Sequence, residues 1–335
     1  MHASFHGRCD IVEILFKHST VHINEQHRVF VDPVVSVPRE LTPLQAAAFN
    51  GHLDVAKILA TVPSIDFNVG SRGYTALNFA ASNGHLDVVK CLATLPDVDV
   101  NATRFVTPLI SAARNGKLEV VKFLTTMNNV DVNAVCNLGY TALSAAALGD
   151  HLEVVKFLVT VPNIDVNVTS NGGYAPLHLA SARGRLDLVK FVVTELNGDV
   201  NVTNNNGYTA LHLAANTGRN KVVKFLATVT KVDMNVTNNN GNTALHLAAN
   251  RGRIEVVKLL VTELHGDVNL TNNDGHTAMH LAAKRGHIEV VKFLATVTNV
   301  DVNVTNNEGN TAMSLAAKNG YLGIVNFLNT ALQYD

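Results

Sequence analysis

Apolar residues in this chain recur at helical spacing, in short blocks separated by polar turns. Residues 235–268 hold one full block. Within it, 244–249 (Ala-Leu-His-Leu-Ala-Ala) and 254–260 (Ile-Glu-Val-Val-Lys-Leu-Leu) each carry an apolar face and predict two short helices. The run Asn-Asn-Asn-Gly at 238–241 is a turn signal, and Thr243 stands where a helix N-cap belongs. The pattern predicts two antiparallel helices joined to the next unit by a hairpin-like loop.

This unit repeats along the chain. The string Thr-Ala-Leu-His-Leu-Ala-Ala begins at 209 and at 243, and a copy with one Met begins at 277, so each start lies 34 residues after the one before. A fixed period of this size is typical of a stacked repeat array, in which each unit contacts only its neighbours. The same slot is held by Thr42, Thr75, Thr107, Thr141, Thr209, Thr243, Thr277 and Thr311, with Ala175 in the remaining repeat.

Charge and composition narrow the class of protein. With a formal net charge of −1, the chain has no overall positive potential that would attract nucleic acid or an anionic membrane. No apolar run approaches the roughly 20 residues that span a bilayer, and the N-terminal residues lack a signal-peptide pattern. Cys9, Cys91 and Cys136 have no metal-ligand spacing, which favours a reducing compartment. We expect a cytoplasmic monomer without a membrane segment.

The repeat unit resembles the ankyrin repeat, whose signature is Thr-Pro-Leu-His-x-Ala within about 33 residues. Residues 42–44 and 107–109 read Thr-Pro-Leu, and 176–178 read Pro-Leu-His. The resemblance covers nearly the whole chain. It implies an all-α solenoid of stacked helix-turn-helix units joined by β-hairpin-like loops, which binds protein partners at the hairpin tips and the concave first-helix face.

The resemblance also divides the chain into three parts. Residues 1–24 are expected to form a truncated ankyrin repeat, because Gly7 aligns with the glycine that ends each first helix. Residues 25–39 read as an inserted loop, and 40–335 as an array of nine repeats. Most units are one residue longer than the family's usual length after the second helix, so we expect a local change of conformation there.

A ladder of histidines is the strongest candidate for catalytic or metal chemistry. Successive helix pairs pack roughly 8–10 Å apart, so neighbouring imidazoles cannot share one zinc ion at ligand distances of about 2 Å. The resemblance implies instead that each histidine bonds near its threonine and braces the next repeat. No phosphate-binding glycine loop, zinc-protease motif or nucleophile elbow is present. We therefore expect no enzyme activity, no cofactor and no metal. The ladder comprises His178, His212, His246 and His280.

The residue before each threonine slot belongs to a hairpin tip, and in four repeats it is tyrosine. Tyr and Arg are enriched in interface hot spots, which favours a binding role. The alternative is that each ring packs on the adjacent hairpin and was copied by duplication. The candidate tip residues are Arg72, Tyr74, Arg104, Phe105, Tyr140, Tyr174 and Tyr208.

A second candidate surface lies at the ends of the first helices. This strip is basic in the later repeats although the whole chain is nearly neutral, and a partner with an acidic face would gain association rate and orientation from it. An ordinary solvated helix end is the alternative. The candidate residues are Arg114, Arg183, Arg251, Lys284 and Arg285.

Together these features predict a non-catalytic scaffold or adaptor that binds a protein. One alternative is a secreted effector, or a regulatory fragment of a larger ankyrin-containing protein. Another is a nucleic-acid-associated factor that uses the basic strip, which is disfavoured because Asp274 and Glu308 lie beside the strip and no aromatic residues interleave with it. A third is an elastic spacer in a larger assembly.

Overall fold

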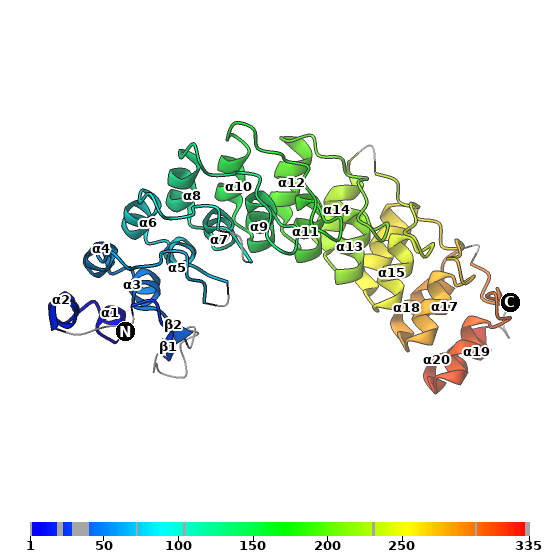
Figure 1. Cartoon of the computed structure of the whole chain (residues 1–335). Helices are drawn as coiled ribbons and strands as arrows, with labels where there is room; N and C mark the ends of the chain where they lie inside the picture. Colours follow the sequence, from blue (N-terminus) through cyan, green and yellow to red (C-terminus); the bar gives the residue numbers. More distant parts are fainter. Residues whose placement is uncertain are drawn as a thin grey trace. The chain divides into compact units, whose positions relative to one another are not determined.

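The computed structural model describes residues 2–18, 23–28, 40–71, 73–102, 105–229, 232–298 and 300–331. Arg72, Arg104 and residues 29–39 of the expected inserted loop lie outside these ranges. The chain divides into two compact units, Met1–Asn171 and Gly172–Asp335, each built from paired helices (Figure 1).

In the first unit, the described residues form helix pairs and one pair of short strands. The first helices contact one another in the order α1, α3, α5, α7, α9, and the second helices in the order α2, α4, α6, α8, α10. β1 and β2 pair in antiparallel fashion, with His27 opposite Leu41. The bounds are α1 His2–Phe5, α2 Cys9–His18, β1 His27–Arg28, β2 Glu40–Leu41, α3 Pro43–Asn50, α4 Leu53–Ala60, α5 Ala76–Asn83, α6 Leu86–Ala93, α7 Pro108–Arg114, α8 Leu118–Thr125, α9 Ala142–Gly149 and α10 Leu152–Leu158.

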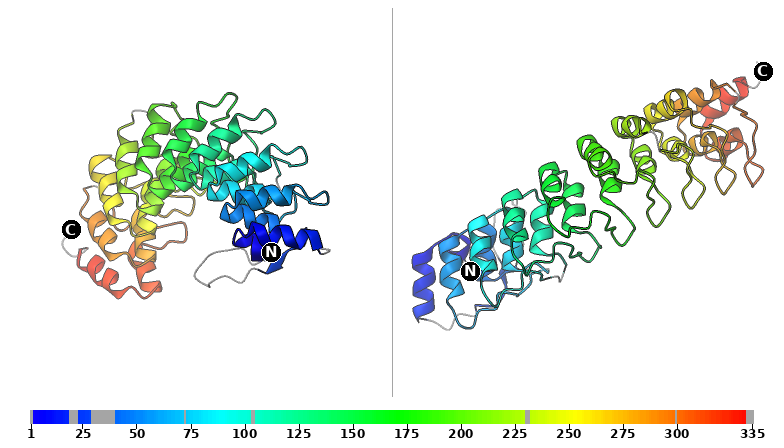
Figure 2. Two further views of the ribbon diagram at one scale, coloured as in Figure 1. Left: turned by 90° about the vertical axis from the view of Figure 1, so that its left-hand side faces the viewer. Right: turned by 90° about the horizontal axis from the view of Figure 1, so that it is seen from above.

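The second unit continues the same plan. Its first helices contact in the order α11, α13, α15, α17, α19, and its second helices in the order α12, α14, α16, α18, α20. Within each unit the tip loops extend to one side of the helix rows (Figure 2). The bounds are α11 Pro176–Arg183, α12 Leu186–Thr194, α13 Ala210–Thr217, α14 Asn220–Ala227, α15 Ala244–Asn250, α16 Ile254–Lys258, η1 Leu259–Glu263, α17 Ala278–Lys284, α18 Ile288–Ala295, α19 Ala312–Lys318 and α20 Leu322–Ala331.

The first helix of each pair is defined by its caps and its small residues. In α3 the Thr42 hydroxyl accepts the backbone N–H of Gln45 (3.2 Å), and the Gln45 side chain accepts the backbone N–H of Thr42 (2.8 Å). Gly51 ends the helix in the left-handed conformation with φ of 76°, where a side chain would be strained. The alanines at 46–48 are fully buried, so the adjacent first helix can approach closely.

The second helix is held mainly by its apolar face. In α8, Val120, Val121 and Leu124 are buried, and each such side chain contributes about 1.5–3 kcal/mol when fully buried. Glu119 and Lys122 form an exposed ion pair at 2.8 Å on the opposite face, a kind of contact worth about 0–1 kcal/mol. Burial of the apolar face therefore dominates the stability of this row.

The recurring Asp-x-Asn sequences join consecutive repeats in the loops between the second helices and the tips. Asn68 donates through Nδ2 to the backbone carbonyl of Asp97 (2.8 Å), and its Oδ1 accepts the backbone N–H of Asp99 (2.9 Å). Asn101 makes the same pair of bonds to the next repeat. These side chains are used structurally, which agrees with their occurrence once per repeat.

The backbone after the second helix differs between repeats. In the repeat of α16 the second helix continues into the π-helix η1, a looser turn. His265 then takes a positive φ of 53°, and the N–H of Gly266 donates back to the carbonyl of Leu260 (2.9 Å). Within the described residues, every helix is too short or too polar to cross a lipid bilayer.

Candidate functional site

The histidine ladder of the second unit is a structural brace between repeats. Nδ1 of His246 accepts the backbone N–H of Thr243 (3.2 Å), and Nε2 lies 3.0 Å from the backbone carbonyl of His276 at the next tip. Because Nδ1 accepts an N–H, the ring is neutral and carries its proton on Nε2. Within the described part of the chain, no three His, Cys, Asp or Glu side chains are grouped as a metal site.

Burial keeps these imidazoles neutral. His246 is 1% exposed, and desolvation lowers its pKa from 6.5 to about 4, against the opposing effect of its bond to the His276 carbonyl. Burial likewise lowers the pKa of His178, His212 and His280. At neutral pH these rings are uncharged and enclosed, so they suit bracing rather than acid–base catalysis.

The first unit fills the same slot with side chains that do not titrate. Gln45 donates through Nε2 to the carbonyls of Val69 (2.8 Å) and Tyr74 (3.1 Å). Asn78 donates through Nδ2 to the carbonyl of Val106 (2.8 Å). The next two repeats carry Ile and Ser at this position. The two units are therefore braced by different chemistry.

The tip tyrosines of the first unit are half-buried. Tyr74 stacks on Phe79 of its own first helix, with ring centroids 5.6 Å apart. Tyr140 is also half-buried, and its carbonyl accepts the N–H of Cys136 (3.0 Å), which closes the tip. In the second unit, Tyr174 and Tyr208 contact the ladder histidines of their own repeats edge-on, at 6.1 and 5.9 Å. Three of the four rings pack on their own repeats, and all four residues are partly exposed.

Large apolar side chains are exposed at neighbouring tips of the first unit. Phe105 is 47% exposed, Val135 47% and Leu138 57%, and we call these three residues the apolar tip patch. The tips are adjacent because the N–H of Asn137 donates to the carbonyl of Phe105 (3.2 Å). The Phe105 ring also covers Gly73, where a Cβ would overlap with the ring.

Sequence reasoning identified Phe105 but missed Val135 and Leu138. The signal that could have found them is an apolar pair inside a tip, where the later repeats carry threonine at the first position and a polar residue or glycine at the second.

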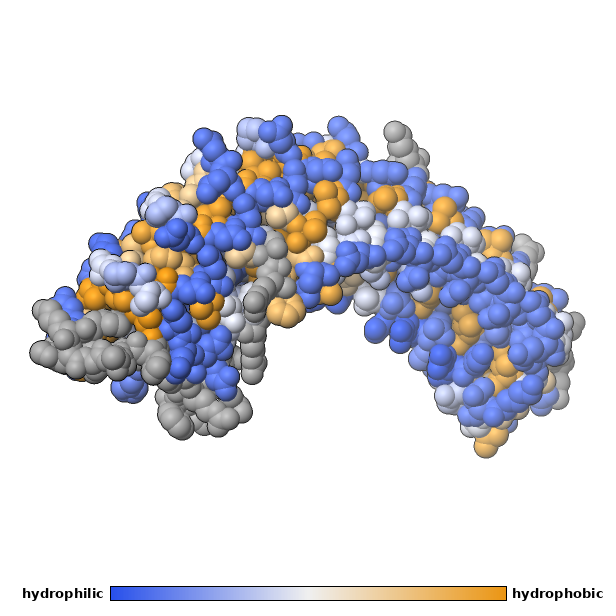
Figure 3. All heavy atoms as spheres, in the orientation of Figure 1, coloured by the Kyte–Doolittle hydropathy of each residue, from blue (hydrophilic) through white to orange (hydrophobic). Residues whose placement is uncertain are grey.

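The tips of the second unit are polar and joined by asparagines. Nδ2 of Asn239 donates to the carbonyl of Asn205 (3.0 Å), and its backbone N–H donates to the carbonyl of Asn206 (3.1 Å). Asn273 and Asn307 repeat both bonds along the array. The visible surface over α15 to α20 is accordingly mostly hydrophilic (Figure 3). These tips offer hydrogen bonds and charge rather than apolar anchors.

The basic strip is exposed, and two of its arginines bridge consecutive repeats. Nε of Arg251 lies 3.2 Å from Oδ1 of Asn216, and Nε of Arg285 lies 3.3 Å from Oδ1 of Asn250. Each bond orients the guanidinium and leaves its terminal N–H groups at the surface. The exposed members of the strip are Arg114 in α7, Arg183 in α11, Arg251, Lys284 and Arg285.

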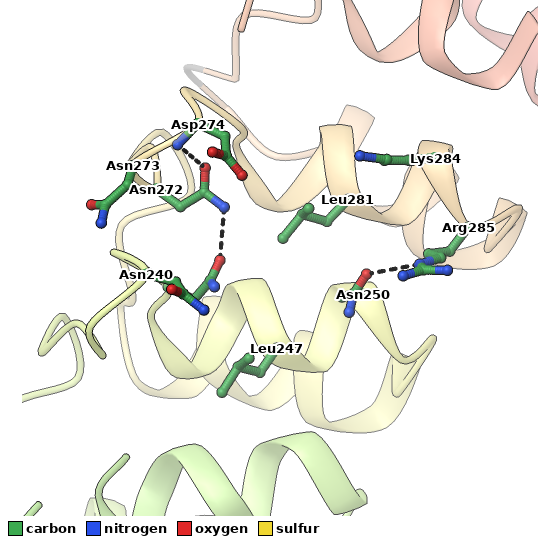
Figure 4. A pocket seen from close by; sticks show the side chains of 10 residues that line it. Asn240, Leu247, Asn250, Asn272, Asn273, Asp274, Leu281, Lys284 and Arg285 are labelled. Atoms are coloured by element: carbon green, nitrogen blue, oxygen red, sulfur yellow. Dashed lines mark hydrogen bonds between the residues drawn. The ribbon is translucent and has the colours of Figure 1, made fainter. Parts of the chain in front are cut away.

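Lys284 and Arg285 share an open pocket of about 340 Å³ between two consecutive repeats of the second unit (Figure 4). Asparagine side chains from two tips and from α15 form most of the wall. Leu247 and Leu281 supply its apolar part, and Asp274 lies at the tip side. The sequence predicted the two cations but not the hollow beside them.

Comparison with protein families agrees with this geometry. The sequence model for Ankyrin repeats (3 copies) matches residues 1–104, 109–204, 177–272 and 261–333. The chain belongs to the ankyrin repeat family. Ankyrin repeats are in general non-catalytic protein–protein interaction modules. A comparison with curated proteins gives no significant match.

In this ankyrin repeat protein, the candidate residues fall into separate groups. Tyr74 and Phe105 lie on adjacent tips of the first unit, since Phe105 covers Gly73. Lys284 and Arg285 line one pocket of the second unit, whereas Arg251 does not line it.

Proposed function

We propose that this protein is a non-catalytic scaffold or adaptor, which binds a partner protein through its tips and the exposed ends of its first helices. The apolar tip patch carries the proposal. Phe105, Val135 and Leu138 expose about half of their surface at adjacent loops of an interaction-type fold. Exposed apolar groups gathered in this way mark interaction sites, and covering them yields about 25 cal/mol per Å² of apolar area.

Polar and charged groups complete the proposed surface. Each tip tyrosine is partly exposed, so Tyr74, Tyr140, Tyr174 and Tyr208 offer aromatic surface to a partner. The exposed cations of the basic strip favour a partner with an acidic face, which they would orient during association. The three cysteines are free thiols, which supports a reducing compartment such as the cytoplasm.

The test compares variants of the full chain for binding to a protein that the chain retains from a lysate and that is then purified. The double variant Phe105→Ser and Leu138→Ser removes most of the patch without touching a first or second helix. We expect its Kd to rise about tenfold or more, because two buried apolar contacts are replaced by polar groups. Leu322→Ser is the control, since Leu322 is 67% exposed at the start of α20, away from any tip.

Circular dichroism would establish that both variants fold. The proposal fails if the double variant binds as tightly as the parent chain, or if Leu322→Ser weakens binding equally. The latter result would move the interface to the second-helix row.

A further inference from the structure

The pocket beside Lys284 exists because one tip lacks an aromatic ring. Tyr208 occupies the residue before the threonine slot in one repeat, and its ring packs on His212 at 5.9 Å. Asn242 occupies that position in the next repeat, and its short amide lines the hollow instead. The resulting volume of about 340 Å³ is at the lower end of the range of about 300–1,000 Å³ for ligand pockets.

Three of the amide oxygens around this pocket already accept hydrogen bonds. Oδ1 of Asn242 accepts from Nδ2 of Asn272 (2.9 Å), and Oδ1 of Asn250 accepts from Arg285 (3.3 Å). Oδ1 of Asn272 accepts the backbone N–H groups of Asp274 (3.1 Å) and of His276. The amide N–H groups of Asn242 and Asn250 have no partner among the described residues, so these two side chains offer hydrogen-bond donors to a ligand.

The charged side chains at the pocket also favour an anionic ligand. Lys284 and Arg285 are exposed and form no ion pair within the described residues, and Lys284 extends from α17 toward the side on which the Asp274 tip of its own repeat lies (Figure 4). Asp274 is the one acidic residue in the lining, and its carboxylate, which lies 3.9 Å from Nδ1 of His276, is 78% exposed. Two cations and one anion leave a positive excess.

We propose that this pocket binds the carboxylate side chain of an extended acidic segment of the partner protein. The Lys284 ammonium and the N–H groups of Asn242 and Asn250 donate to the carboxylate, while Leu247 and Leu281 contact its methylene groups. Such charge-assisted bonds are roughly twice as strong as neutral ones, so they favour a carboxylate over a neutral amide of the same shape. The inference rests on the proposed function, because it assumes that a protein segment lies along the tips.

The test uses fluorescent eight-residue peptides and the full chain. One peptide alternates glutamate and serine, its counterpart carries glutamine for glutamate, and a third carries phosphoserine for glutamate. We expect the glutamate peptide to bind about tenfold more tightly than the glutamine peptide, as a charge-assisted bond predicts, and at least as tightly as the phosphoserine peptide.

Two variants locate the binding. Asn242→Tyr restores the ring that the preceding repeat carries at Tyr208, so it fills the pocket with a residue that this fold already accommodates; it should abolish the preference for glutamate. Lys284→Gln should weaken glutamate binding about five- to tenfold. Lys221→Gln is the control, because it removes the same charge from an exposed site on α14, and it should leave binding unchanged.

The inference is overturned if the glutamate peptide does not bind, if only the phosphoserine peptide binds, or if Asn242→Tyr retains the preference. An equal loss with Lys221→Gln would likewise overturn it by indicating diffuse attraction. The outcome is separable from that of the proposed function. A purified partner that is lost with the Phe105 and Leu138 double variant but binds Asn242→Tyr normally would refute the pocket alone.

Discussion

Mild acid should destabilise the second unit through His246. The folded protein holds this ring neutral, because burial lowers its pKa from 6.5 to about 4. His212 and His276 lie nearby and lower this pKa further when they are charged. The unfolded chain therefore binds more protons than the folded one between these values. The stabilising contribution of the neutral ring is complete above the unfolded pKa of 6.5 and is lost as the pH falls toward 4.

The size of this effect follows from the shift. One pKa unit corresponds to about 1.36 kcal/mol. A shift from 6.5 to about 4 therefore limits the loss of stability to about 3 kcal/mol. Between pH 8 and pH 5 only part of the titration is complete, and the expected loss is about 2 kcal/mol. Burial lowers the pKa of the other ladder histidines as well, and the matched variant separates their contribution from that of His246.

The assay is native-state hydrogen exchange of the full chain at pH 8 and pH 5, corrected for intrinsic exchange rates. The opening free energy of α15 is the measured quantity, because repeat arrays open locally. The matched variant is His246→Gln, since Gln45 in the first unit accepts the cap N–H and donates to two carbonyls from the same slot. We expect the opening free energy to fall about 2 kcal/mol further in the parent chain than in this variant. Helix α7 carries Ile instead of histidine at the corresponding position, so it serves as an internal reference without this titrating group. Equal pH dependence of α15 in both proteins would refute the reasoning.

Two further predictions concern the tips and caps. Gly275→Ala and Gly309→Ala each place a side chain at a positive φ, 75° and 73° respectively, which costs about 1–2 kcal/mol of stability. At Gly275 the new Cβ would also lie 2.7 Å from the backbone nitrogen of Asn307, whereas at Gly309 nothing lies within 4 Å of it. Urea unfolding should therefore show that Gly275→Ala is less stable than Gly309→Ala by about 1 kcal/mol. Thr243→Ala removes the hydroxyl that caps α15, and thermal unfolding should show a loss of about 1 kcal/mol; an unchanged midpoint would mean that the cap contributes nothing there.

The helix pairs and their caps were predictable from the sequence, because they depend on residues close together in the chain. Thr243 as an N-cap is a local signal, and the structure confirms it, because α15 begins directly after Thr243. The 34-residue period then dictates stacking, since one helix pair cannot bury its apolar face alone.

The interaction surface was predictable only in part. The sequence marks tyrosines and arginines at the tips, but the packing of Tyr208 on His212 depends on the angle between the tip and its helix. The pocket depends on bonds between repeats, such as that from Asn272 to Asn242, which uses the amide oxygen of Asn242 and leaves its N–H groups free. Such bonds depend on how neighbouring repeats are aligned in space, and the sequence of a single repeat does not reveal that alignment.

The central claim is that a partner protein binds the tips and first-helix ends of this ankyrin repeat protein. The most direct test is a hydrogen-exchange footprint of the full chain with the purified partner. We expect protection at the tip residues 135–140, beside Phe105, and at the Asp274 tip of the second unit, with little change in α8 and α10. Protection confined to those second helices, with unchanged exchange at the tips, would contradict the account.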